Sequence, residues 1–128
     1  MKLWLIVPIK PFAEGKSRLA GRLSPSKRSS LSRQLFHHVI TQALAASELT
    51  GILVVSRDTT VLNDLQAPHL HLIAETGNGL NRAIQQGREE ALRRDADAIL
   101  VLPADLPYLQ SHDITTLYQR SVDNNGVL

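Results

Sequence analysis

Short apolar runs alternate along this chain with longer segments in which apolar residues recur every three or four positions. The runs Leu3–Val7, Ile52–Val55 and Ala98–Leu102 are too short for helices and consist mainly of aliphatic residues. Such runs are typical of strands that are buried on both faces of a parallel sheet. The segment His69–Ile73 alternates more weakly, which predicts a short strand at the edge of the sheet.

Two of the segments between these runs carry a clear helical period. Ser24 or Ser26 can cap a first helix, and Leu80–Arg94 predicts a second one. The apolar stripe of the first helix consists of Leu31, Leu35, Val39, Ile40 and Ala43, and that of the second consists of Leu80, Ile84, Gly87 and Ala91. The pairs Glu89/Arg93 and Glu90/Arg94 lie four positions apart, as on a solvated helix face.

Two shorter segments complete the pattern. Thr59–Leu65 predicts one or two helical turns ended by Pro68, and Ser111 is expected to cap a last helix that runs to about Arg120. Strands that alternate with helices imply parallel pairing and right-handed crossovers. The sequence therefore predicts an α/β fold, a three-layer sandwich with a mostly parallel sheet, in one domain over residues 1–128.

Composition narrows the classes of function. The 128 residues fit one domain, which buries roughly two-thirds of its unfolded surface. The absence of cysteine excludes disulfides and thiolate sites, and a net charge of +2 is too small to argue for a nucleic-acid partner. The apolar segment Met1–Ile9 is too short for a membrane span or a signal sequence, so no membrane association and a cytoplasmic location are expected.

Basic residues gather near the start of the chain and favour an anionic small ligand. They are Lys10, Lys16, Arg18, Arg22, Lys27, Arg28 and Arg33. In an α/β sheet, ligands bind beyond the carboxyl ends of the strands. Three segments fall there: Lys10–Arg18, Thr76–Asn81 and Pro103–Pro107.

The stretch Glu14–Ser17, EGKS, looks like the end of a phosphate-binding P-loop, but the rest of that motif is missing. Its first glycine would fall at Lys10, and Pro11 removes a backbone donor from the loop. What remains is a loop that brings Lys10, Lys16 and Arg18 to the end of the first strand. These cations either bind phosphate oxygens or form a solvated basic surface.

The other two segments carry weaker signals. In GNGLNRAI, residues 77–84, the glycines permit close approach of a flat ring and Asn81 offers a donor and an acceptor for a base edge. The alternative is an ordinary helix start. In LPADLP, residues 102–107, Asp105 follows a buried strand and can either bind Mg²⁺ or cap a turn.

Together these segments resemble a known enzyme family. The chain is similar to the 2-phospho-L-lactate and phosphoenolpyruvate guanylyltransferases of coenzyme F420 (deazaflavin) biosynthesis. Three stretches carry the similarity, in this order: VPIKPFAEGKSRLAGRLSPSKR, ETGNGLNRAI and ILVLPADLPYL. The resemblance implies a nucleotide-diphospho-sugar-transferase-like fold. It implies transfer of GMP from GTP to the phosphate of phosphoenolpyruvate or 2-phospho-L-lactate, with release of pyrophosphate.

The resemblance also implies roles for individual residues. Lys16 and Arg18 would contact the triphosphate and act in catalysis, with Lys10 nearby. Gly79, Leu80 and Asn81 would lie beside guanine, and Asp105 would bind the Mg²⁺ cofactor. The partners implied are GTP and a small phosphorylated carboxylic acid.

Two alternatives stay open, and one departure from the family stands out. The chain could be a nucleotide-binding module without catalysis, or it could use another acceptor such as 3-phosphoglycerate. Family members are longer, and their second half supplies a further acidic metal ligand and much of the acceptor site. We therefore expect an N-terminal fragment that is inactive alone and forms homo-oligomers through an unpaired strand edge.

Overall fold

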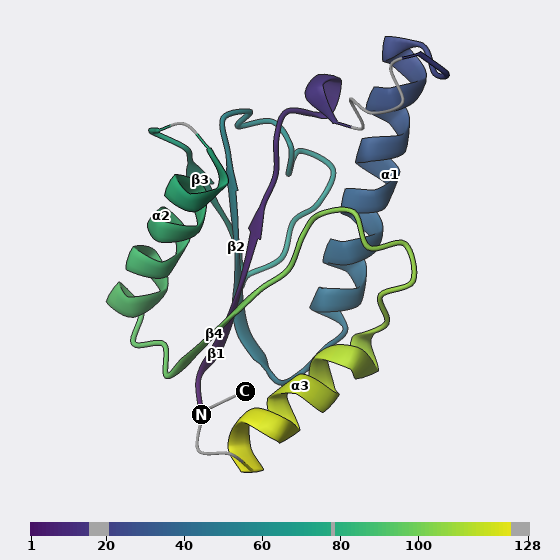
Figure 1. The fold of residues 1–128 in the computed structure, drawn as a ribbon. Helices are drawn as coiled ribbons and strands as arrows, with labels where there is room; N and C mark the ends of the chain where they lie inside the picture. Colours follow the sequence, from purple (N-terminus) through teal and green to yellow (C-terminus); the bar gives the residue numbers. More distant parts are fainter. Residues whose placement is uncertain (16–20, 78, 124–128) are drawn as a thin grey trace.

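The structure is a computed structural model that describes residues 1–15, 21–77 and 79–123. Its centre is a four-stranded sheet in the order β3-β2-β1-β4, and every neighbouring pair is parallel (Figure 1). The strands are β1 (Leu3–Pro8), β2 (Leu49–Ser56), β3 (Leu70–Ala74) and β4 (Ala98–Val101). The four predicted strands and their parallel arrangement are confirmed, with β3 at one edge.

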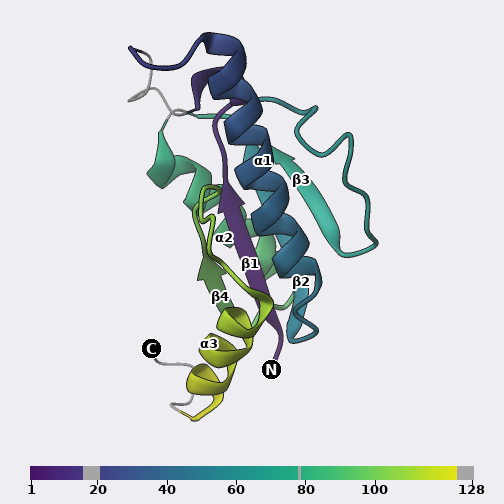
Figure 2. The ribbon, with the colours of Figure 1, turned by 90° about the vertical axis from the view of Figure 1, so that its right-hand side faces the viewer.

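Helices cover both faces of this sheet. They are the short 3-10 helix η1 (Phe12–Glu14) and the α-helices α1 (Pro25–Leu44), α2 (Leu80–Arg93) and α3 (Ser111–Asp123). Figures 1 and 2 show α1 and α3 on one side of the sheet and α2 on the other. The predicted three-layer sandwich is therefore confirmed.

The alternating side chains of β1 divide the core between these two faces. Leu5 and Val7 pack in one cluster with Phe36 and Ile40 of α1. Ile6 points to the opposite face, where α2 approaches so closely that a Cβ on Gly87 would lie 2.6 Å from the Ile6 Cγ2 atom. Glycine at this position therefore allows the helix to pack directly on the strand.

Of the two caps predicted for the first helix, Ser24 and Ser26, the structure has Ser24. The Ser24 hydroxyl accepts a hydrogen bond from the backbone N–H of Lys27 at 3.2 Å, and Pro25 occupies the first helical turn. Both features satisfy or remove backbone donors that a helix start leaves without partners. At the last helix, Ser111 is the first residue of α3 and not its cap, and the helix extends to Asp123.

The expected helical turns at Thr59–Leu65 are wrong. This segment forms consecutive turns, such as the one closed by Asn63 N–H and the Thr60 carbonyl. Asp58 Oδ1 accepts from both the N–H and the hydroxyl of Thr60, at 2.9 and 2.6 Å, and these bonds lower the pKa of Asp58. Such local side-chain bonds compete with helix formation.

The charged face of α2 differs in one pairing from the expectation. Glu90 bonds to Arg94 at 3.1 Å, as the four-residue spacing predicts, but it also bonds to Arg93 at 2.9 Å. Arg93 thus reaches the carboxylate three positions before it and not Glu89. Across the described ranges, no helix is long and apolar enough to cross a membrane.

The strand order places a switch point between β1 and β4. The chain leaves β1 through α1 to reach β2 on one side, and it reaches β4 on the other side through α2. In open parallel sheets, the loops after two such strands diverge and leave a crevice in which ligands bind.

Candidate functional site

An open cleft of about 900 Å³ lies at the carboxyl edge of the sheet, where this crevice is expected. The loops that follow all four strands contribute to its wall, together with η1, α1 and the first turn of α2. The lining residues are Pro8, Ile9, Lys10, Glu14, Gly15, Ser32, Val55, Arg57, Glu75, Gly79, Leu80, Ala83, Pro103, Ala104 and Asp105.

The cleft brings together four of the residues expected from the sequence. Lys10 follows β1, Gly79 and Leu80 begin α2, and Asp105 follows β4. Asn81 is exposed on the first turn of α2 and is not among the lining residues. The three segments named from the sequence therefore meet at one site.

Lys16 and Arg18 lie outside the described residues. Glu14 and Gly15, which precede them in the chain, line the cleft. The expected contacts of Lys16 and Arg18 with phosphate remain predictions.

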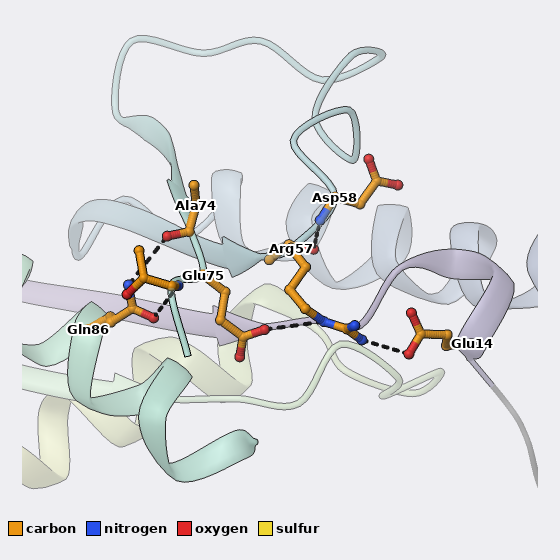
Figure 3. Close-up of polar contacts among 8 residues, drawn as sticks. Glu14, Arg57, Asp58, Ala74, Glu75 and Gln86 are labelled. Atoms are coloured by element: carbon orange, nitrogen blue, oxygen red, sulfur yellow. Dashed lines mark hydrogen bonds and ion pairs between the residues drawn. The ribbon is translucent and has the colours of Figure 1, made fainter. Parts of the chain in front are cut away.

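An ion-paired arginine crosses the cleft wall (Figure 3). The Arg57 Nη2 atom lies 2.6 Å from Glu14 Oε1, and its Nε atom lies 3.5 Å from Glu75 Oε2. The hydrogen bond to Glu14 and the charge of that carboxylate are the main causes that raise the pKa of Arg57. Arg57 therefore connects η1 with the segment that precedes α2.

Glu75 is held in place by its backbone neighbours. The side chain of Gln86, which is buried on α2, donates to the Ala74 carbonyl at 3.3 Å and accepts from Thr76 N–H at 3.2 Å. The Glu75 N–H itself donates to the Ser56 carbonyl at 2.9 Å. One amide side chain and one strand thus fix the backbone on both sides of this carboxylate.

Glu14, Arg57 and Glu75 also line the cleft but were not among the residues expected from the sequence. A usable signal was present, because Arg57 and Glu75 directly follow β2 and β3, and Lys10 and Asp105 come shortly after β1 and β4. Extending the carboxyl-end rule to all four strands would have found both residues. Their pairing could not be seen, since 18 positions separate them in the chain.

The oxygen donors of the cleft fit a Mg²⁺ ion that is bound jointly by the protein and by substrate phosphates. Asp105 offers carboxylate oxygens, which Mg²⁺ prefers, and it is exposed on the cleft wall. Within residues 1–15, 21–77 and 79–123, no three His, Asp or Glu side chains are grouped closely enough to hold a metal ion. Mg²⁺ does not need such a cage, because it usually retains waters and binds through one or two carboxylates and substrate phosphates.

Solved structures share this architecture. A protein assigned as a nucleotide-diphospho-sugar transferase from Desulfovibrio desulfuricans G20 superimposes with a TM-score of 0.70 at 17% identity, over 93% of this chain and 54% of that chain. A CMP:2-keto-3-deoxy-manno-octonic acid synthetase complexed with CTP gives a TM-score of 0.65 at 24% identity, over 99% of this chain and 50% of the other. Identities this low establish the fold alone.

Curated relatives are similar in sequence over most of the chain. Phosphoenolpyruvate guanylyltransferases from Sphaerobacter thermophilus and Rubrobacter xylanophilus are 38% and 36% identical, over 88% and 93% of this chain. A 2-phospho-L-lactate guanylyltransferase from Methanothermobacter thermautotrophicus is 30% identical over 91% of it. The matches cover 54%, 58% and 52% of these relatives, so the chain spans about half of their length.

A family match agrees with these relatives and covers nearly the whole chain. The family described as guanylyl transferase CofC like matches residues 3–128. The matched range includes every strand of the sheet and every segment of the cleft. The chain therefore belongs to the CofC-like guanylyl transferase family.

Proposed function

We propose that this chain forms the nucleotide-binding part of a guanylyltransferase that uses Mg²⁺. GMP moves from GTP to the phosphate of phosphoenolpyruvate or 2-phospho-L-lactate, and pyrophosphate leaves. The observation that carries the proposal is the cleft itself, in which Lys10, Gly79, Leu80 and Asp105 from three separate segments meet. Family membership supports the same activity.

The reaction needs little covalent help from the protein. An oxygen of the acceptor phosphate attacks the α-phosphorus of GTP, and the bond from that phosphorus to the oxygen of the departing pyrophosphate breaks. Because a phosphate is already ionised near neutral pH, no protein side chain has to remove a proton. The contribution of the chain is then to position the two substrates and to neutralise charge.

The residues divide these tasks along the cleft. Lys10, together with Lys16 and Arg18, binds triphosphate oxygens and offsets the charge that develops on the leaving group. Asp105 would hold the Mg²⁺ ion, which would supply further charge neutralisation when it is bound. Gly79 and Leu80 provide a close, partly apolar surface for the base.

The test is pyrophosphate release by the full-length protein. We expect release with GTP and Mg²⁺ in the presence of phosphoenolpyruvate or 2-phospho-L-lactate, and much less with ATP or with metal removed by a chelator. Assaying 3-phosphoglycerate alongside identifies the acceptor. Binding of GTP with no pyrophosphate release from any acceptor would instead support a non-catalytic nucleotide-binding module.

A further inference from the structure

The charged residues of the cleft follow one another along the carboxyl edge of the sheet. Since the strands lie in the order β3-β2-β1-β4, the sequence across the edge is Glu75, Arg57, Lys10 and Asp105. Neighbouring strands lie about 4.8 Å apart, so roughly 14 Å separates β3 from β4. Glu75 and Asp105 therefore follow the two edge strands of the sheet, with Arg57 and Lys10 following the strands between them.

This order gives a bound nucleotide a direction, provided that the proposed function holds. Mg²⁺ and the triphosphate belong with Asp105 and Lys10 at the β4 and β1 end. The base then extends toward β2 and β3, where Glu75 lies. A carboxylate repels phosphate, but it is a strong acceptor for the N–H groups of an uncharged ring.

Glu75 is presented to the cleft in a fixed position. Gln86 bonds to the backbone on either side of it (Figure 3), and the Glu75 N–H continues the strand ladder to the Ser56 carbonyl. The side chain of Glu75 is only 10% exposed, so its neighbours restrict the rotamers that it can adopt. A base that binds beside Glu75 meets an acceptor whose position is already set, which reduces the ordering cost of recognition.

Arg57 adds a donor beside this acceptor. Its Nε atom lies 3.5 Å from Glu75 Oε2, whereas its shorter contact, 2.6 Å, is with Glu14. A carboxylate has two oxygens with about four acceptor positions, so the 3.5 Å contact with Arg57 does not use up the acceptor capacity of Glu75. The two side chains together offer two acceptors followed by a donor.

We propose that Glu75 and Arg57 recognise the Watson–Crick edge of guanine and so determine the choice of nucleotide. The Glu75 carboxylate accepts from N1–H and from the 2-amino group, and the Arg57 guanidinium donates to O6. Adenine places an acceptor at N1 and an amino donor at the position of O6, which opposes both side chains. Sites built to hydrogen-bond a ligand reject analogues that leave their polar groups without partners.

The test measures nucleotide binding to the full-length protein by calorimetry, without an acceptor substrate. The wild type is expected to bind GTP more tightly than ATP. It should also bind GTP more tightly than ITP, which lacks only the 2-amino group. In Glu75→Gln, one N–H of the base faces an amide donor, so GTP affinity should fall about 10–100-fold. The GTP-to-ITP affinity ratio should move toward one.

Two matched variants separate recognition from general effects of removing a carboxylate. Glu14→Gln deletes the shorter partner of Arg57 but no base-facing acceptor, so the GTP-to-ITP ratio should persist. Glu90→Gln breaks ion pairs with two arginines on α2 outside the cleft and should leave GTP binding unchanged.

The outcomes distinguish this inference from the proposed function. A wild type that prefers GTP to ATP, with a Glu75→Gln variant that keeps this preference, overturns the role of Glu75 and leaves the guanylyltransferase proposal standing. A wild type that does not bind GTP overturns both. If Glu75→Gln does not fold, the comparison of GTP and ITP binding by the wild type still tests the inference. Equal affinities for the two nucleotides would contradict recognition of the 2-amino group.

Discussion

Asp105 is the residue on which the metal assignment depends. It follows β4, at the switch point of the sheet, and it shares the cleft with Lys10. Its carboxylate offers the oxygen ligands that Mg²⁺ prefers. This proposed role can be tested by removing the charge alone.

We predict that Asp105→Asn in the full-length protein lowers guanylyl transfer about 10–100-fold. The basis is the loss of a charged contact worth roughly 1.5–3 kcal/mol. The melting temperature should barely change, since the side chain lies on the exposed cleft wall. A steady-state assay across Mg²⁺ concentrations measures the effect.

Asp64→Asn is the matched control for this substitution. Asp64 is also exposed and pairs with Arg33 at 3.2 Å, but it is not among the residues that line the cleft. Its variant should keep normal activity. If Asp105→Asn were equally active, the assignment of Asp105 to the metal would be wrong.

At the scale of elements, the start of α2 connects the fold to the cleft. Its N-cap is Gly79, with φ 92° and ψ 161°, and both Gly79 and Leu80 line the cleft. This backbone region is essentially restricted to glycine. A Cβ at Gly79 would meet nothing within 4 Å, so any cost of a side chain there comes from backbone strain and not from crowding.

We predict that Gly79→Ala destabilises the protein by about 1–3 kcal/mol, the usual cost of a residue held in this backbone region. It should also weaken GTP binding, because relief of the strain would shift the segment that faces the base. Chemical denaturation and calorimetric titration measure the two effects.

Gly21→Ala serves as the control for Gly79→Ala. A Cβ at Gly21 also meets nothing within 4 Å, and its φ is not positive. Its effect on stability should stay within about 0.5 kcal/mol. Equal effects of the two substitutions would contradict the role of backbone strain at Gly79.

The elements that could be predicted from the sequence are those whose pattern is local. The β1 run, the Ser24 cap and the period of α2 each depend on neighbouring residues, and all three are confirmed. The segment after β2 was predicted wrongly because one carboxylate, Asp58, bonds to Thr60 and stabilises turns. A helical period cannot reveal such a bond in advance.

In the candidate site, too, residues with a local signal could be predicted, whereas contacts between distant segments could not. Lys10, Gly79, Leu80 and Asp105 were found because each lies at a strand or helix end, which is a local feature. The contacts of Arg57 with Glu14 and Glu75 join η1 with the segments that follow β2 and β3. They exist only once the strand order is set, and several strand orders are compatible with the same alternation of strands and helices.

At the scale of the whole molecule, β4 forms one of the two edges of the sheet. β4 pairs with β1, and no other strand of the described chain pairs with β4. Beside it lies a hollow of about 420 Å³ whose lining includes Leu92 and Val101, which are 54% and 38% exposed. Open strand edges next to apolar side chains favour pairing with another chain.

We therefore predict that the 128-residue chain self-associates in a concentration-dependent manner, and that Val101→Lys shifts it toward monomer. A lysine on an edge strand opposes edge-to-edge pairing because its charge would have to be buried or brought close to a second copy. Val122→Lys is the control, since Val122 is 43% exposed but lies on α3 and not on the sheet. Sedimentation velocity over a range of concentrations measures the association. A wild-type chain that stays monomeric throughout would contradict an exposed pairing edge at β4.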